Sequence, residues 1–213
     1  MAGDDVDILE RSWRGAWRAI GAAGDGAPVG DALLAAYREP QRHYHTLQHL
    51  RECIERCNAC RDLAARPAEV EIALWFHDAV YDVHRNDNER RSADWARAAL
   101  AGAGVAADVV ARVESLVMAT RHGSATPESA DEELLVDIDL AILGADGDRF
   151  AEYDAQIRRE YAHVAEAEFR ARRGAVLAAF LARDRIYRTA GLRAELEARA
   201  RTNLALAMAG NVG

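Results

Sequence analysis

The residues best suited to metal chemistry in this sequence are a cluster of histidines and a few histidines and aspartates that interrupt apolar stretches. His43, His45 and His49 lie in the segment RHYHTLQHL, and His77 is followed directly by Asp78 in ALWFHDAVYD. An unpartnered carboxylate is costly to bury, so an aspartate at the end of an apolar helical run is usually paired, capping a helix or bound to a cation. Imidazole nitrogens and carboxylate oxygens are ligands of borderline and hard divalent metals. These segments therefore indicate a metal site.

Two further spacings bear on this site. His45 and His49 are four residues apart, so they would share one face if the segment after Pro40 is helical. Asp137 and Asp139 interrupt the apolar segment LLVDIDLAILG, and on a helix they point about 200° apart, so only one of them needs to face a metal. We favour Asp139 as the ligand and keep Asp137 as the alternative.

The order of these motifs resembles the HD-domain superfamily of metal-dependent phosphohydrolases. That superfamily has a histidine motif, then a His-Asp dyad, then a distant aspartate, and YHTLQH is similar to the YHNxxH signature of cyclic nucleotide phosphodiesterases. The wider pattern of RHYHTLQH, FHDAVYD, NERRSA, DIDLAILG, EYAHV and ARTNL resembles a bacterial family of predicted HD phosphohydrolases over nearly the whole chain. The resemblance implies an all-α, single-domain HD-type helical bundle.

The resemblance also assigns roles to individual residues. It implies that His49, His77, Asp78 and Asp139 bind a divalent ion and that His45 donates a proton to the leaving group. We expect one or two ions per chain, chosen from Mn, Fe, Co, Ni, Zn and Mg. Such an ion would activate water for hydrolysis of a phosphomonoester or phosphodiester, which we expect to belong to a nucleotide or a related small metabolite.

The resemblance makes Asp78 a catalytic residue as well as a ligand. Three other residues are weaker candidates for the catalytic or substrate-binding site. Arg42 precedes the histidine cluster and its planar guanidinium could clamp a phosphate. Glu89 follows the dyad at a helix start, where a carboxylate could orient the nucleophilic water. His122, in the segment TRHG, is a candidate substrate contact or extra ligand. For Arg42 and Glu89 the alternative is a surface or helix-supporting role.

Two other functions are kept as alternatives. The first is a non-catalytic sensor that keeps the HD-type site to bind a metal or nucleotide. The second is an iron–sulfur redox protein, because Cys53, Cys57 and Cys60 have the CxxxCxxC spacing of radical S-adenosylmethionine enzymes. These cysteines instead continue a helix, where thiols serve as small core residues, so we regard the second alternative as remote.

Apolar residues at helical spacing run through the whole chain, and sustained period-two alternation is absent. Turn-forming residues divide the chain into roughly nine helical segments. We expect one domain spanning residues 1–213, with a metal-site core at about 40–145 and C-terminal helices over 146–209 packed on it. Trp13 and Trp17, four residues apart, are typical of a helical core, and a homodimer contact is the alternative reading of this pair.

The composition excludes several classes of protein. The chain has 27 basic and 35 acidic residues, a net charge of -8, and no lysine among its cations. Schiff-base chemistry and P-loop lysines are therefore excluded, and we expect a small phosphorylated substrate and no stable nucleic-acid partner. Without a long apolar run or the features of a signal peptide in Met1–Glu10, and with an odd number of cysteines, we expect a cytoplasmic protein with no membrane partner.

Overall fold

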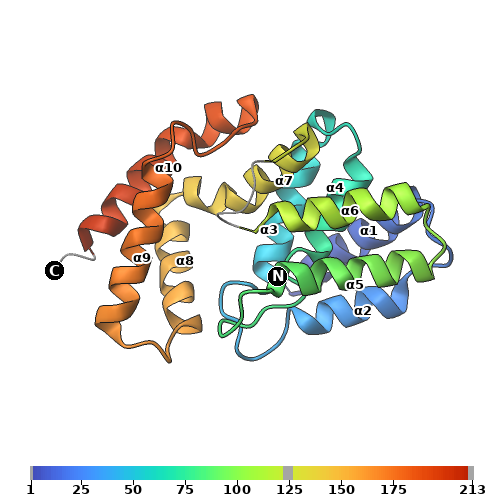
Figure 1. Ribbon diagram of the computed structural model, residues 1–213, viewed down its shortest axis with the longest axis horizontal. Helices are drawn as coiled ribbons and strands as arrows, with labels where there is room; N and C mark the ends of the chain where they lie inside the picture. The colour runs from blue at the N-terminus through green and yellow to red at the C-terminus, as the bar shows by residue number, and fades with distance from the viewer. Residues whose placement is uncertain (1, 122–126, 211–213) are drawn as a thin grey trace. The chain divides into compact units, whose positions relative to one another are not determined.

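The computed structural model describes residues 2–121 and 127–210, and all the secondary structure in these residues is helical (Figure 1). The all-α prediction is therefore confirmed. The α-helices, in chain order, are α1 (Ala2–Ala19), α2 (Ala27–Ala36), α3 (Leu47–Ala59), α4 (Pro67–Phe76), α5 (Asn88–Gly102), α6 (Ala107–Ala119), α7 (Ala130–Asp139), α8 (Gly147–Glu160), α9 (Glu166–Leu181) and α10 (Ala190–Gly210). Two short 3-10 helices, η1 (Arg61–Leu63) and η2 (Leu140–Gly144), complete the described secondary structure.

The chain divides into two compact units, Met1–Ile138 and Asp139–Gly213. The sequence places the end of the metal-site core a few residues later, near 145, and the expectation of one domain stays a prediction. The division falls inside α7, just before its last residue. Asp139 is therefore positioned by the helix that ends the first unit.

Helix α4 is the centre of the first unit. It contacts α1, α3, α5 and α6, and every residue from Glu69 to Phe76 is buried. A helix that is apolar all round its axis is stable only when other elements cover it on every side. Its buried carboxylate at Glu71 accepts hydrogen bonds from Ser12 at 2.7 Å and Arg61 at 3.0 Å. The C-terminus of α4 therefore has a fixed position in the core.

The tryptophans of α1 are core residues that pack on the start of α2. Trp13 and Trp17 are buried, and their ring N–H groups donate to the carbonyls of Gly26 and Ala23. Gly26 has φ +67°, and a Cβ atom built there would lie 2.7 Å from the Trp17 ring. Both rings are therefore core residues of the first unit, and the expectation of a homodimer stays a prediction.

Helix α7 is tied to the first unit at its N-terminus. The Asp131 carboxylate accepts hydrogen bonds from the backbone N–H groups of Ala65 at 2.8 Å and Arg66 at 3.0 Å, directly before α4. The Glu132 carboxylate accepts a hydrogen bond from Ser115 of α6 at 2.7 Å. These buried contacts fix the position of the helix that Asp139 ends.

The second unit is built around η2, which contacts α8 and α10. The Asn203 amide donates to the carbonyls of Leu143 at 2.9 Å and Ala145 at 2.8 Å, so α10 satisfies the backbone of this short helix. The Glu197 carboxylate accepts from the backbone N–H groups of Ile186 and Tyr187 before α10. The bonds of Asn203 join segments about 60 residues apart, and those of Glu197 hold the irregular backbone directly before α10.

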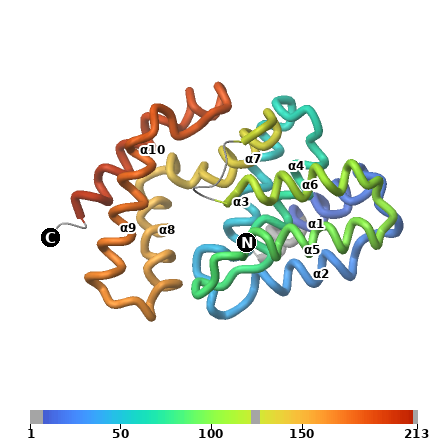
Figure 2. The backbone as a smooth tube through the Cα atoms, in the orientation of Figure 1, coloured from blue at the N-terminus to red at the C-terminus, as the bar shows by residue number. Residues whose placement is uncertain are grey.

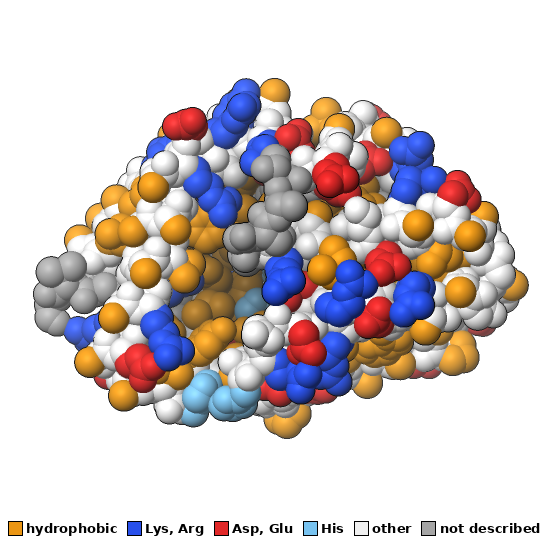
Figure 3. Space-filling model, viewed as in Figure 1, with side chains coloured by type: hydrophobic (Ala, Val, Ile, Leu, Met, Phe, Trp, Pro, Cys, Tyr) orange, Lys and Arg blue, Asp and Glu red, His pale blue; other side chains and the backbone are white. Residues whose placement is uncertain are grey.

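The outer face of the first unit carries paired charges along α5 and α6, which run alongside each other in Figure 2. Arg90 and Arg97 of α5 form ion pairs with Glu114 of α6, and Arg112 pairs with Asp108. Blue and red side chains accordingly alternate on this face in Figure 3. Within the described part of the chain, no helix is long and apolar enough to cross a membrane.

Candidate metal centre

The His-Asp dyad lies at the end of α4 and in the turn that follows. His77 is the C-cap of α4 and is only 1% exposed, whereas the Asp78 side chain is 19% exposed. The N–H of Ala79 donates to the Phe76 carbonyl at 3.0 Å, and the N–H of Val80 donates to the Ser92 hydroxyl at 3.0 Å. The turn is therefore rigidly held.

Arg42 is the residue that fixes this turn most directly. Its guanidinium donates to the backbone carbonyls of Asp78 at 2.6 Å and Ala79 at 2.9 Å, and to that of His45 at 3.3 Å. It lies over the rings of Tyr37 and Tyr81, and its side chain is fully buried. Arg42 therefore supports the turn that carries Asp78 and is not a surface residue, and its expected contact with a phosphate stays a prediction.

His49 projects from the first turns of α3. The Thr46 hydroxyl accepts a hydrogen bond from the N–H of Gln48 at 3.3 Å, so Thr46 caps the helix and α3 begins at Leu47. The expectation that His45 and His49 share a helical face is therefore wrong, because His45 precedes the helix. The His45 ring instead stacks on Tyr81 at 3.9 Å between centroids and lies 5.8 Å from the His49 ring.

Three donor atoms from these segments converge. The distance between His49 Nε2 and His77 Nε2 is 3.0 Å, and Asp78 Oδ2 lies 3.0 Å from His77 Nε2 and 3.3 Å from His49 Nε2. Ligand bonds of about 2.0–2.2 Å to nitrogen and oxygen place neighbouring ligands at separations of this size. The residue types and the spacing therefore fit a divalent cation that contacts all three atoms.

The hydrogen bonding of His77 prepares it for this role. His77 Nδ1 lies 2.7 Å from the Leu74 carbonyl oxygen, which can only accept, so Nδ1 carries a proton and Nε2 is the nitrogen available to a metal ion. A backbone carbonyl that orients a histidine in this way is a common feature around metal ligands. The 3.0 Å distance between His77 Nε2 and Asp78 Oδ2 fits a shared proton in the metal-free protein, and a cation could take the place of that proton.

The Asp78 carboxylate is stabilised in its charged form. Burial raises the pKa of Asp78, but the neighbouring His77 and His45 side chains and the hydrogen bonds with His49 and His77 outweigh burial and hold that pKa well below its usual range. Nearby, burial raises the pKa of Tyr37 to about 12, so its phenol stays neutral and donates to the Trp75 carbonyl. The charged ligand Asp78 therefore lies beside a neutral aromatic side chain.

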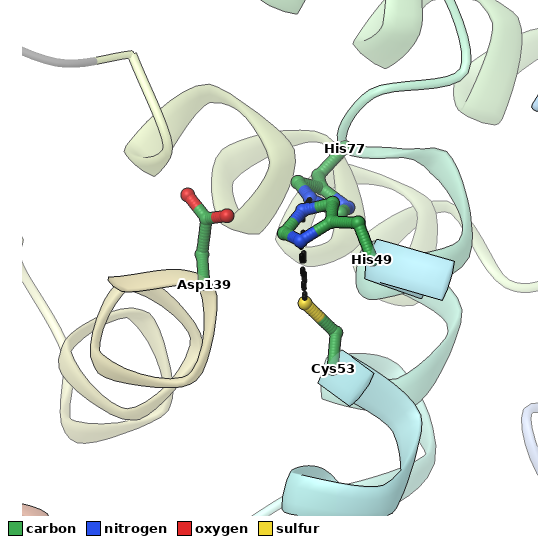
Figure 4. Close-up of side chains that lie close together, drawn as sticks. All are labelled: His49, Cys53, His77 and Asp139. Atoms are coloured by element: carbon green, nitrogen blue, oxygen red, sulfur yellow. Dashed lines mark hydrogen bonds between the residues drawn. The ribbon is translucent and has the colours of Figure 1, made fainter. Parts of the chain in front are cut away.

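Two further residues belong to a buried group that could hold a metal ion. The potential ligand atoms of His49, Cys53, His77 and Asp139 all lie within 4.8 Å of one another (Figure 4). Asp139, and not Asp137, is the aspartate of this group. The sequence favours Cys53 as a core residue. It lies one helical turn after His49, and this i, i+4 spacing in α3 is the signal that could have identified it as a potential ligand.

The remaining predicted residues lie elsewhere. Glu89 is half-buried in the first turn of α5, and its role stays a prediction. His122 lies outside the described residues. Cys57 is in α3 and Cys60 caps it, and all three cysteines are buried along this helix as expected for core residues. Burial first, then the Glu71 carboxylate, raise the pKa of Cys57 to about 12, which disfavours the thiolate that an iron–sulfur cluster requires.

Comparison with protein-family models, with curated proteins and with solved structures gives no match for this chain. The resemblance to HD phosphohydrolases therefore stays a hypothesis carried by the motifs themselves. The structure adds that His49 lies against the dyad residues His77 and Asp78 in an all-helical first unit. It also shows that His49, Cys53, His77 and Asp139 form a group that could hold a metal ion.

Proposed function

We propose that this protein is a metal-dependent phosphohydrolase that binds a divalent cation through His49, His77, Asp78 and Asp139. The observation that carries the proposal is the convergence of two imidazole nitrogens and one carboxylate oxygen at 3.0–3.3 Å, with the other ring nitrogen of His77 bonded to the Leu74 carbonyl. The substrate we infer is a phosphomonoester or phosphodiester of a nucleotide or a similar small metabolite.

When bound, a divalent ion would lower the pKa of a water ligand and polarise a phosphoryl oxygen. The protein supplies the geometry for the ion, because Arg42 and Ser92 hold the turn that carries Asp78. The Asp78 side chain is 19% exposed, whereas His49 and His77 are buried. We therefore propose that a small substrate approaches the ion from the side of Asp78.

His45 is the residue placed to transfer a proton in this proposal. Its ring is half-buried and held against Tyr81, and it lies close enough to Asp78 to lower the pKa of that carboxylate. Histidine is the most common general acid and base in enzymes, so its imidazolium form can protonate a leaving oxygen and its neutral form can accept a proton in turn. Its position outside the group of ligands suits this role better than metal binding.

The test is a screen for phosphate release from nucleotides and generic phosphoesters with added manganese, cobalt, nickel, zinc or magnesium. We expect metal-dependent hydrolysis by the wild-type protein and none by Asp78→Asn. His45→Gln is expected to keep its metal and to lose about 100-fold or more in kcat. His84→Gln, an exposed histidine seven residues after His77, is the matched control and should retain activity.

Two outcomes would change the proposal. Bound metal without turnover on any substrate would contradict the enzyme and favour the non-catalytic sensor. Hydrolysis that persists in Asp78→Asn at the wild-type rate would show that the activity does not depend on this site.

A further inference from the structure

We propose that Cys53 contributes a sulfur ligand to the metal centre and makes it selective for thiophilic borderline ions such as zinc, cobalt and iron(II). This inference rests on the proposed cation at His49 and His77, and it names the chemical class of that cation. It assigns a metal-binding role to a residue that the sequence motif leaves out.

The geometry of α3 supports the assignment. His49 and Cys53 are one helical turn apart on the same face, and the Cys53 sulfur lies 3.7 Å from His49 Nε2 and 3.8 Å from His49 Nδ1. Figure 4 shows the sulfur directed at the His49 ring. A zinc–sulfur bond of about 2.3 Å and a zinc–nitrogen bond of about 2.0–2.1 Å, at a tetrahedral angle, separate the two ligand atoms by roughly 3.6 Å. The observed separation from Nε2 is of this size.

The burial of Cys53 makes the sulfur chemically significant. Cys53 is 2% exposed, so a cation in the group meets the sulfur without competition from bulk water. Thiolate is a soft ligand that binds zinc, iron and copper(I) well and binds magnesium and calcium poorly, whereas carboxylate and imidazole ligands accept a wider range of metals. On binding, the Cys53 thiol releases its proton to solvent and forms a sulfur–metal bond, with no transfer of electrons.

The same helix provides a matched control. Cys57 is one turn further along α3 and is also 2% exposed, but it lies outside the ligand group. Burial and the Glu71 carboxylate raise the pKa of Cys57 to about 12, so it stays a thiol at neutral pH. Replacing either cysteine by serine removes one sulfur atom from a buried position in α3, but only Cys53→Ser changes the group of potential ligands.

The experiment is the optical spectrum of the cobalt(II)-loaded protein. We expect an intense near-ultraviolet band from thiolate-to-cobalt charge transfer in the wild type and in Cys57→Ser, and no such band in Cys53→Ser. We also expect Cys53→Ser to bind zinc and cobalt at least about tenfold more weakly, with manganese affinity changed by less than about threefold.

X-ray absorption of the zinc-loaded wild type gives a measurement that does not depend on a variant folding. The proposal predicts one sulfur neighbour at about 2.3 Å in addition to nitrogen and oxygen neighbours. Cobalt bound without the charge-transfer band, or zinc with nitrogen and oxygen neighbours only, would overturn the role of Cys53 and leave the proposed hydrolase intact. Failure of the wild type to bind any cobalt or zinc would overturn both.

Discussion

Replacing Arg42 by methionine tests whether this residue supports the site or binds substrate. Methionine keeps an apolar stem between Tyr37 and Tyr81 but removes the guanidinium and its hydrogen bonds to the carbonyls of Asp78 and Ala79 at 2.6 and 2.9 Å. Hydrogen bonds to charged groups contribute about 1.5–3 kcal/mol each, so losing these two costs about 3–6 kcal/mol. That is a large part of the usual 5–15 kcal/mol of a domain.

The assay is urea unfolding followed by circular dichroism, paired with a metal titration. We expect Arg42→Met to lower the free energy of unfolding by about 3–6 kcal/mol and to weaken cation binding, because the turn that carries Asp78 loses its support. Arg38→Met, an exposed arginine four residues earlier, should change stability by less than about 0.5 kcal/mol. If Arg42→Met matched Arg38→Met in stability and raised only the KM for substrate, the supporting role would be refuted and the phosphate clamp favoured.

Two further predictions concern the fold. Burial raises the pKa of Glu197, but hydrogen bonds from two backbone N–H groups and from Arg201 outweigh burial and lower it, so this carboxylate stabilises the protein above its unfolded pKa of about 4.3. Glu197→Gln should therefore lower the free energy of unfolding by about 1–2 kcal/mol at neutral pH, and this loss should vanish as the pH falls through the folded pKa of Glu197. Urea unfolding midpoints of both proteins, at neutral pH and at a pH below that pKa, test this. A difference in stability that stays constant with pH would contradict it. Gly26→Ala should cost more than about 2 kcal/mol, because it combines φ +67° with a clash against Trp17. Gly24→Ala, with φ +72° but open space around it, should cost about 1 kcal/mol in the same thermal unfolding assay, and equal losses would show that the clash is absorbed.

Helix ends marked by glycine or proline are predictable from this sequence, and others are not. The breaks at 21–28, near 67, at 102–104 and at 144–147 match the ends of helices. The breaks after Glu160 and Leu181 have no such residue at the helix end. There, Arg158 donates to the Tyr161 carbonyl at 2.7 Å, and Arg201 donates to the Leu181 carbonyl at 3.1 Å. Arginine side chains satisfy these terminal carbonyls, and one of them comes from a distant helix, which local sequence does not reveal.

The candidate site was predictable in its residue types but not in its arrangement. His77 and Asp139 could be selected because they interrupt apolar segments, and His49 because it belongs to a histidine cluster. The structure places all three in one group with Cys53. The position of His45 could not be predicted from spacing, because the cap at Thr46 delays the start of α3. Cys53 was missed because a cysteine in a helix is usually a core residue, and only its contact with His49 distinguishes it.

The role of Arg42 also required the structure. An arginine beside a histidine cluster suggests a phosphate ligand, but its guanidinium reaches backbone carbonyls 36 and 37 residues later in the chain. Such long-range contacts between a side chain and a turn are set by the tertiary fold. The sequence near Arg42 therefore shows that a guanidinium is present close to the histidines, but not which carbonyl groups it binds.

The most direct test of the central claim is the metal content of protein purified without chelator, measured by mass spectrometry for the wild type, His77→Ala and a control, His84→Ala. The account predicts one or two ions per chain in the wild type and the control, and loss of metal in His77→Ala, whose helical circular dichroism spectrum should stay largely unchanged. Equal metal content in His77→Ala and the wild type, or no metal in any preparation after addition of divalent ions, would contradict the claim that these residues form a metal centre.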